Sequence, residues 1–543
     1  MVVLLLLGCA EPVAPSPETG AAGLAVAPLP APLLLRRLSL DLRGTLPSLA
    51  ELDAVEADVG ALPGLRDAML SDPRLQERLV DLLAEQYLTR TDEFNIDHTQ
   101  FGLAEDQAYA FVASAGEEPL RLAAWIAATG QPWTEVARSE YTFANALLLS
   151  IWPVEAAPEA GDADLSGWGP ARYTDGRPAG GIVMTNGFAW RYSQAVFARS
   201  HAAAVSDLLM CHDYLARPIE FDAASLLAEG ELQAATREMP VCVSCHASLD
   251  PLAASLLGFF AHEMYDPQEA SHYHPEREAL GPYLLGTSPA WYGEPLASIA
   301  SLGDAIAGDP RFVPCAVQRF AAGMWRRPVD IEDRGVLTEL QVDFESANLA
   351  VPALLASLTD TEEYRAGELL ADAPSELVDR VATRRLLTAP QLADTVEQLT
   401  GHRWEEEGWD QLDNDVIGYR LLLGGASPPG TNVTQRDHGL TRALVLKRLA
   451  QAAAATVVTS DFDDVEPAPR VFSLVDLSTT PDDAEFGAQV ELLCRLFFAE
   501  RPNAQEQADL AALWSAVEAS EGPAAAWTSL VAALLRDIRF WSY

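Results

Sequence analysis

Two cysteines three positions apart, followed at once by a histidine, are the residues of this sequence best placed to do chemistry: Cys242, Cys245 and His246. This pattern is typical of the covalent attachment of a c-type haem. On a helical turn, residues three apart share one face, so that both sulfurs can bond the two vinyl groups of one porphyrin. His246 then follows directly and can ligate the iron. The stretch therefore predicts a covalent haem with His246 as its proximal ligand.

Two other interpretations of the same cysteines stay open on the sequence. Cys242 and Cys245 could form a structural disulfide, or they could be half of a zinc site. A zinc site needs further ligands, and Cys211 and His212 upstream are the nearest candidates to complete a tetrahedron. In either case the protein would hold no haem, and the cysteine unit would be a structural clip.

A haem iron also has a sixth coordination position. Four side chains of suitable chemistry lie within thirty residues of His246, and they are His262, Met264, His272 and His274. A methionine there raises the reduction potential relative to a histidine. The spacing does not select one of them. Met324 lies in a helical pattern and is expected to be a core residue instead.

The chain begins with a short apolar run that reaches Leu6-Leu7-Gly8-Cys9. This resembles a bacterial lipobox, in which Cys9 would carry the lipid, and the run is an abbreviated signal peptide without a basic flank. Residues 1–32 are accordingly expected to be the signal and a flexible linker rich in Pro and Ala. No later stretch has the roughly eighteen uninterrupted apolar residues of a membrane helix. We expect an exported lipoprotein, periplasmic or on the outer surface, that meets the membrane only through its N-terminal lipid.

Export matters for the other cysteines, because thiols outside the cytoplasm tend to be oxidised. Three cysteines remain, and they are Cys211, Cys315 and Cys494. Cys494 lies in an apolar helical pattern and is expected to be a small core residue. A disulfide between Cys211 and Cys315 is therefore the favoured pairing.

The charge of the chain restricts its partners. Its 543 residues include 79 acidic and 36 basic side chains, which give a net charge of −43. Such a surface repels nucleic acid and favours a basic partner, so we expect no nucleic-acid binding and a basic redox partner. No catalytic triad, phosphate-binding loop or pair of carboxylates stands out, and the sequence does not decide whether the protein is an enzyme.

Hydrophobic periodicity predicts a mainly α fold of several modules. Leu34, Leu35, Leu38 and Leu42 recur at helical spacing, and Gly44 can end that helix. Ser48 and Glu51 then form a capping box for the next helix. The expected modules are 33–115, 116–290 with the haem motif, 291–370, and 371–543.

Two regions of the chain look alike and predict a duplicated helical hairpin. One runs from Phe320 through Arg327-Pro328 to Tyr364, and the other from Cys494 through Arg501-Pro502 to Trp541. In each, the proline is expected to start a helix with acids in its first turn. Between modules, Gly161 to Gly181 is predicted to be a loop, whose Trp168 and Tyr173 either cover a cofactor edge or pack within the loop.

Taken together, these segments resemble planctomycete-type cytochrome c-like secreted proteins, which are built from helical modules of unassigned function. The most specific likeness is Cys242 to Pro251, a Cys-x-x-Cys-His-x-x-x-Asp-Pro pattern, followed by Gly258-Phe259. Leu33 to Gln86 is similar to their N-terminal module, with its Leu-Arg-Arg-Leu, Asp-Leu-x-Gly and Leu-Pro-Ser phrases. Further similar stretches are Phe312 to Pro328, Arg384 to Gly401 and Leu493 to Tyr543.

The resemblance implies haem attachment and electron transfer, without a named substrate. The sequence therefore predicts an exported, lipid-anchored c-type haem protein that transfers electrons at the cell envelope. Asp250-Pro251 is expected to shape the turn that leaves the motif. The alternative is a non-catalytic envelope scaffold whose cysteine unit is a disulfide or a zinc site.

Overall fold

The computed structural model describes residues 25–543 apart from several short segments. Those outside the description are 92–93, 95, 193–197, 215, 217–228, 262–265, 372, 375–376, 378–380, 382–383, 407, 414–417, 426–438 and 464–468. The chain is mainly helical, with 63% helix and 7% strand, which confirms the expected mainly α character. No helix in the described part is long and apolar enough to cross a bilayer. Cys9 and the expected lipobox lie outside the described residues.

Four helices form the N-terminal part, and they are α1 (Ala31–Arg43), α2 (Leu49–Ala57), α3 (Leu62–Leu70) and α4 (Arg74–Tyr87). α1 ends because Gly44 adopts a φ of 72°, from which its N–H donates to the Leu40 carbonyl. α2 begins with a capping box, in which the side chains of Ser48 and Glu51 each accept a hydrogen bond from the other residue's N–H. Both helix ends were predicted, and both are confirmed.

The linker expected up to Pro32 ends earlier than predicted. Residues Val26–Pro28 form strand β1, which pairs antiparallel with β7 (Ala366–Leu369). α1 then starts at Ala31, with Pro32 in its first turn. The composition of the linker does not reveal this strand, because its pairing partner lies more than three hundred residues away in the sequence.

A small sheet interrupts the helices after α5 (Ala108–Ala128). Its strands are β2 (Thr142–Ala144), β3 (Val154–Ala156) and β4 (Gly169–Tyr173). They pair antiparallel in the order β2-β4-β3. The same part of the chain holds two short helices, α6 (Glu135–Arg138) and α7 (Ala146–Ile151). The stretch from Ala137 to Leu148 therefore contains the end of α6, then β2 and the first residues of α7. Likewise the loop expected from Gly161 to Gly181 contains β4. Pairing between distant strands outweighs the local periodicity in both places.

The motif lies in the next group of elements. These are α8 (Asn186–Tyr192), α9 (Arg199–Met210), α10 (Glu229–Glu238), α11 (Pro240–Ser255), α12 (Pro267–Ser271), α13 (Gly281–Leu284), the hairpin of β5 (Ala290–Trp291) and β6 (Glu294–Pro295), and α14 (Leu302–Ala307).

The two regions predicted to be repeats have the same order of helices. The first holds α15 (Phe312–Trp325), α16 (Arg334–Ser346), α17 (Val351–Asp360) and α18 (Glu362–Arg365), and the second holds α22 (Ala484–Phe498), α23 (Ala504–Glu521), α24 (Pro523–Arg536) and α25 (Ile538–Trp541). α15 and α22 both end on a residue of positive φ, Arg326 at 57° and Ala499 at 58°.

Between these two regions lie α20 (Ala389–Thr400), the hairpin of β8 (Glu405–Glu406) and β9 (Trp409–Asp410), and α21 (Leu440–Phe462).

Pro328 does not start a helix as predicted, and α16 begins only at Arg334. The intervening turn is held by a buried ion pair, in which Arg327 donates to both carboxylate oxygens of Asp333 at 2.6 and 2.7 Å. The Asp330 N–H donates to the same carboxylate. These bonds stabilise a loop at the point where proline alone would favour a helix start.

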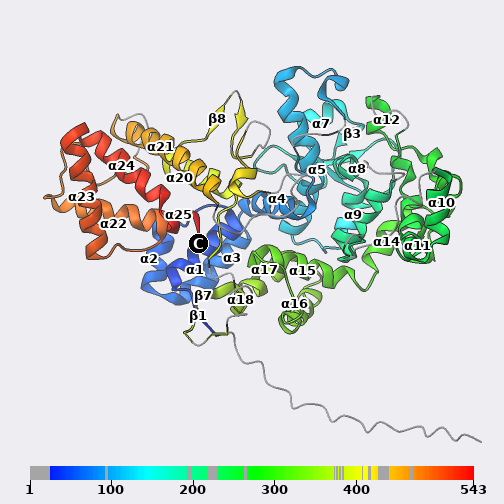
Figure 1. Cartoon of the computed structure of the whole chain (residues 1–543), viewed down its shortest axis with the longest axis horizontal. Coiled ribbons are helices and arrows are strands. Elements are labelled where there is room, and N and C mark those ends of the chain that lie inside the picture. Colours follow the sequence, from blue (N-terminus) through cyan, green and yellow to red (C-terminus); the bar gives the residue numbers. More distant parts are fainter. Residues whose placement is uncertain are drawn as a thin grey trace, which may run out of the picture.

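Two large hydrophobic cores organise the chain. The first extends from α1 to α17, and the second is formed mainly by α20 to α25. The module boundary predicted between 115 and 116 falls inside α5, and both sides of it contribute to the first core. Figure 1 shows the C-terminal helices at the left, α1 to α4 in the middle, and α11 with α10 at the far right. The motif helix is thus at the end of the molecule opposite to α22–α24.

A buried polar cluster, here called the Asp41 cluster, joins the two cores. The Asp41 carboxylate accepts hydrogen bonds from Arg385 (2.9 Å), Tyr364 (3.0 Å) and Tyr543 (2.5 Å). Arg37 beside it donates to the carbonyls of Tyr364 and Ala366 at 2.6 and 2.9 Å. Burial and the neighbouring Arg385 lower the pKa of Arg37 to about 9. Asp41 is therefore the acid that balances closely packed guanidinium groups.

Candidate functional site

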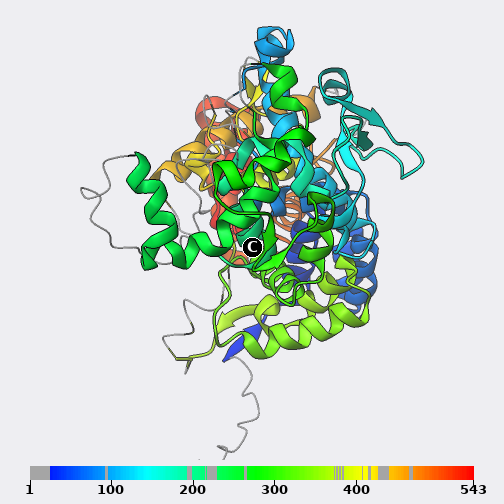
Figure 2. The same cartoon turned by 90° about the vertical axis from the view of Figure 1, so that its right-hand side faces the viewer.

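The Cys-x-x-Cys-His motif lies in the first turns of α11. Pro240 occupies the first helical turn, where its missing N–H is tolerated, and the N–H groups of Cys242 and Val243 both donate to the Met239 carbonyl. Cys242 and Cys245 are free thiols, each partly buried. The structure thus places both sulfur-bearing residues one helical turn apart. Figure 2, which views the molecule from this end, shows α10 and α11 facing the viewer.

His246 is fixed by a carboxylate on its own helix. Its Nδ1 lies 2.8 Å from Oδ1 of Asp250, four residues further on. Asp250 is held in turn by Arg199 at the start of α9, whose Nε donates to Oδ1 at 2.7 Å and whose Nη2 donates to Oδ2 at 2.9 Å. This pair, Arg199 and Asp250, was not identified as functional from the sequence.

The carboxylate of Asp250 is ionised in this setting. Burial favours a higher pKa, but the hydrogen bonds from His246 and Arg199 outweigh it and hold the pKa of Asp250 below its usual value. An ionised carboxylate only accepts, so Nδ1 of His246 must be the protonated ring nitrogen. Among the described residues the hydrogen bond to this ring is at Nδ1, which leaves the Nε2 lone pair available to a ligand.

The prediction that Asp250-Pro251 forms a turn leaving the motif is wrong. Pro251 lies inside α11, which continues to Ser255. An internal proline destabilises a helix by about 3 kcal/mol or more. The following residues offset this by deep burial, since Leu252, Ala253, Ala254 and Leu256 are at most 1% exposed. Helix continuation keeps Asp250 one turn below His246.

The candidates for a sixth ligand differ in their surroundings. His262 and Met264 lie outside the described residues. Met324 is a buried core residue, as expected. His274 is engaged at both ring nitrogens, with Nε2 2.8 Å from the Glu269 carbonyl and Nδ1 3.5 Å from the Glu276 carboxylate. His272 contacts Ser271, its Nδ1 lying 3.2 Å from Oγ.

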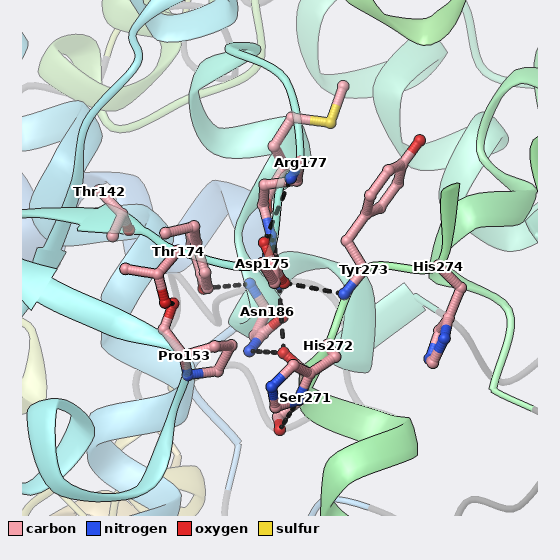
Figure 3. Close-up of polar contacts among 12 residues, drawn as sticks. Thr142, Pro153, Thr174, Asp175, Arg177, Asn186, Ser271, His272, Tyr273 and His274 are labelled. Carbon is pink, nitrogen blue, oxygen red and sulfur yellow. Dashed lines mark hydrogen bonds and ion pairs between the residues drawn. The ribbon is translucent and has the colours of Figure 1, made fainter. Parts of the chain in front are cut away.

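A polar network anchors the segment that carries His272 and His274 (Figure 3). Arg177 donates through Nη2 to Asp175 at 2.6 Å and to the Ser271 carbonyl at 3.2 Å. The Tyr273 N–H also donates to Asp175 at 2.8 Å, and the Asn186 side-chain amide donates to the Ser271 carbonyl at 2.9 Å. Asp175 lies in the stretch from Gly161 to Gly181, which the sequence predicts to be a loop. The long-range bonds of Asp175 give it a structural role in addition.

Trp168 and Tyr173 pack within the protein core. Tyr173 donates to Glu118 at 2.5 Å, and Glu118 also accepts from Thr142 and from the Gly187 N–H. Burial raises the pKa of this fully enclosed Glu118. Trp168 is buried beneath Arg121, whose guanidinium carbon lies 5.5 Å from its ring centre. The contacts of Trp168 and Tyr173 are therefore packing and hydrogen-bonding contacts with the rest of the protein.

Cys211 and Cys315 form a disulfide, the pair that the sequence favoured. It connects the C-terminal end of α9 to the first turn of α15, across the loop of 104 residues that contains the motif. Cys211 therefore has no thiolate to offer zinc. The described residues also contain no group of three or more His, Cys, Asp or Glu side chains arranged for a metal. Cys494 is a buried free thiol, as expected.

His201 on α9 is a buried, neutral histidine. Its ring lies 5.3 Å from that of Phe188 and 5.5 Å from that of Phe259, and its Nε2 is 3.1 Å from the Val183 carbonyl. Burial lowers the pKa of His201 to about 4. Because the unfolded chain binds this proton near pH 6.5 and the folded chain does not, stability is lost as the pH falls from about 6.5 to 4.

Between pH 6.5 and pH 4, the buried His201 should lower the free energy of unfolding by about 3 kcal/mol. We expect His201→Gln to remove this part of the pH dependence. Urea unfolding at pH 7 and pH 4.5 measures it as the difference in unfolding free energy between the two conditions. The matched control is His272→Gln, which replaces a partly exposed imidazole. Equal pH dependence in wild type and His201→Gln would contradict the prediction.

Comparison with protein-family models, with curated proteins and with solved structures gives no match to this chain.

Proposed function

We propose that the protein is an exported, lipid-anchored c-type haem protein that transfers electrons at the cell envelope. The observation that carries this proposal is the set of donors on α11: two free thiols one turn apart, and an adjacent histidine with Nδ1 on an ionised carboxylate. Metal-bound histidines almost always donate their second ring N–H in this way. Cys242 and Cys245 would form the thioethers, and Nε2 of His246 would be the proximal ligand.

A haem held here supplies one-electron redox chemistry at its iron. The residues of the chain hold it in place and orient it. Cys245 packs against the first core, which gives the attachment a rigid base, while Cys242 and Cys245 are both partly exposed. The position of α11 at one end of the molecule supports exchange of electrons with another protein (Figure 1). The net charge of −43 favours a basic redox partner.

The covalent bond gives a direct test. The full-length chain is produced in a host with the export and haem-maturation machinery, then run on a denaturing gel and stained for haem. We expect a stained band, a mass increase of one haem, and loss of both in the double variant Cys242→Ser and Cys245→Ser. Cys494→Ser is the matched control and should keep the stain, because Cys494 lies in the second core.

An unstained wild-type chain, beside a stained cytochrome from the same host, would overturn the proposal. It would leave the alternative, a non-catalytic scaffold whose cysteines form a disulfide or a zinc clip. Metal analysis and thiol counting of that same preparation distinguish these two forms. A zinc site needs ligands in addition to Cys242 and Cys245. Cys211 cannot be one of them, because it is in a disulfide.

We further propose that α15–α18 and α22–α25 are copies of one ancestral helical unit. In support, each unit has a first helix ended by a residue of positive φ, an Arg-Pro pair in the following turn, two further helices and a short last helix. α15–α18 pack in the first core and α22–α25 in the second, and we assign both units a scaffold role.

A further inference from the structure

We infer that Asp250 and Arg199 tune the haem iron with opposite signs: Asp250 lowers the reduction potential through His246, and Arg199 raises it. This inference rests on the proposed function, since it needs an iron at Nε2 of His246. It gives a positioning role to Asp250, and it adds Arg199, which lies outside the Cys-x-x-Cys-His-x-x-x-Asp-Pro pattern.

The geometry at Oδ1 of Asp250 carries the argument. This one oxygen receives the Nδ1–H of His246 at 2.8 Å and the Nε–H of Arg199 at 2.7 Å, and Oδ2 receives Nη2 of Arg199 at 2.9 Å. Hydrogen bonds in which the donor or the acceptor is charged are about twice as strong as those between neutral groups. His246 and Arg199 thus compete for the same carboxylate charge.

The effect on the iron follows from the direction of charge transfer. A carboxylate that accepts Nδ1–H pushes electron density into the imidazole and makes Nε2 a stronger donor. A stronger donor stabilises ferric over ferrous iron, which lowers the potential. Arg199 draws charge away from the carboxylate and so weakens this effect. Removing one residue should therefore move the potential opposite to removing the other.

The surroundings keep the pair in place and strengthen it. His246 and Asp250 share one helix at a spacing of four residues, which holds their separation. The side chain of Asp250 is 7% exposed and that of Arg199 is 21% exposed. Screening by water is weaker at such depth than at the surface, so the charges act strongly on the ring.

The first test compares potentials of the haem-loaded full-length chain by spectroelectrochemical titration at a single pH. We expect Asp250→Asn to favour reduction about tenfold, a rise of 59 mV for one electron. Arg199→Gln should lower the potential. The matched control is Asp207→Asn, since Asp207 also lies on α9 and pairs with an arginine, Arg319 at 2.8 Å, but has no bond to His246. It should leave the potential unchanged.

A second test needs no haem. In the unloaded chain labelled with ¹⁵N-histidine, the NMR signal of His246 should report the Nδ1–H tautomer, and Asp250→Asn should shift it toward Nε2–H. A wild-type ring that is mainly Nε2–H would overturn the positioning role. Signals are assigned by a His246→Gln variant.

The outcomes separate this inference from the proposed function. If the wild-type chain takes no haem, the proposed function fails and the effect on the potential fails with it. If the haem attaches but Asp250→Asn and Arg199→Gln shift the potential in the same direction, or neither shifts it, the inference alone is overturned.

Discussion

Replacing Cys211 and Cys315 by alanine is expected to lower the free energy of unfolding by about 4 to 5 kcal/mol. The bridge closes a loop of 104 residues, and a cross-link over about 100 residues removes roughly 4.7 kcal/mol of chain entropy from the unfolded state. Cys315 is buried at 1% exposure, so the folded state also loses a packed sulfur. Urea unfolding under oxidising conditions measures the loss.

A reducing agent supplies the matched comparison. Reductant should destabilise the wild-type protein and the variant Cys494→Ala alike, because both keep the bridge. It should leave the Cys211→Ala, Cys315→Ala double variant unaffected. Equal stability of wild type and double variant, with no response to reductant, would show that no bridge forms. Loss of the bridge should also loosen α10–α14, which lie between the two cysteines.

Asp41→Ala is expected to destabilise the protein by about 3 to 5 kcal/mol, the usual effect of breaking a buried ion pair. The side chains of Asp41 and Arg385 are 2% and 0% exposed, so the guanidinium would stay buried without its acid. The hydroxyls of Tyr364 and Tyr543 would lose their acceptor as well. Chemical unfolding followed by tryptophan fluorescence gives the free energy.

The matched control for Asp41 is another acid that joins α1–α4 to the C-terminal helices. Asp53 on α2 pairs with Arg495 on α22, but its side chain is 64% exposed. Asp53→Ala should therefore change stability by no more than about 1 kcal/mol. A similar, small loss in both variants would show that the Asp41 cluster does not stabilise the junction of the two cores.

Much of the local structure could be predicted from the sequence, because its causes are local. Gly44 ends α1 and the Ser48–Glu51 box starts α2 since both depend on backbone conformations within one turn. The spacing of Cys242 and Cys245 on one helical turn is of the same kind. The pairing of Cys211 with Cys315 followed from elimination, as Cys494 has the apolar neighbours of a core residue.

Predictions failed where side-chain contacts or strand pairing outweigh the preference of a single residue for a helix boundary or a loop. Pro251 and Pro328 both indicated helix boundaries. The first lies inside α11 because its neighbours are buried in the core, and the second precedes a turn held by the Arg327–Asp333 pair. Strand β4 and strand β1 were missed because a strand of a few residues is defined by what it pairs with.

The sequence by itself determined the donors at the candidate site, Cys242, Cys245 and His246, because their covalent order is also their order on the helix. Only the tertiary structure decided the environment of those donors. Arg199 is 51 residues away from Asp250 in the sequence, yet it shares an oxygen of that carboxylate with His246. That arrangement depends on the packing of α9 against α11, which arises from burial of surfaces over the whole first core and is not encoded in either segment alone.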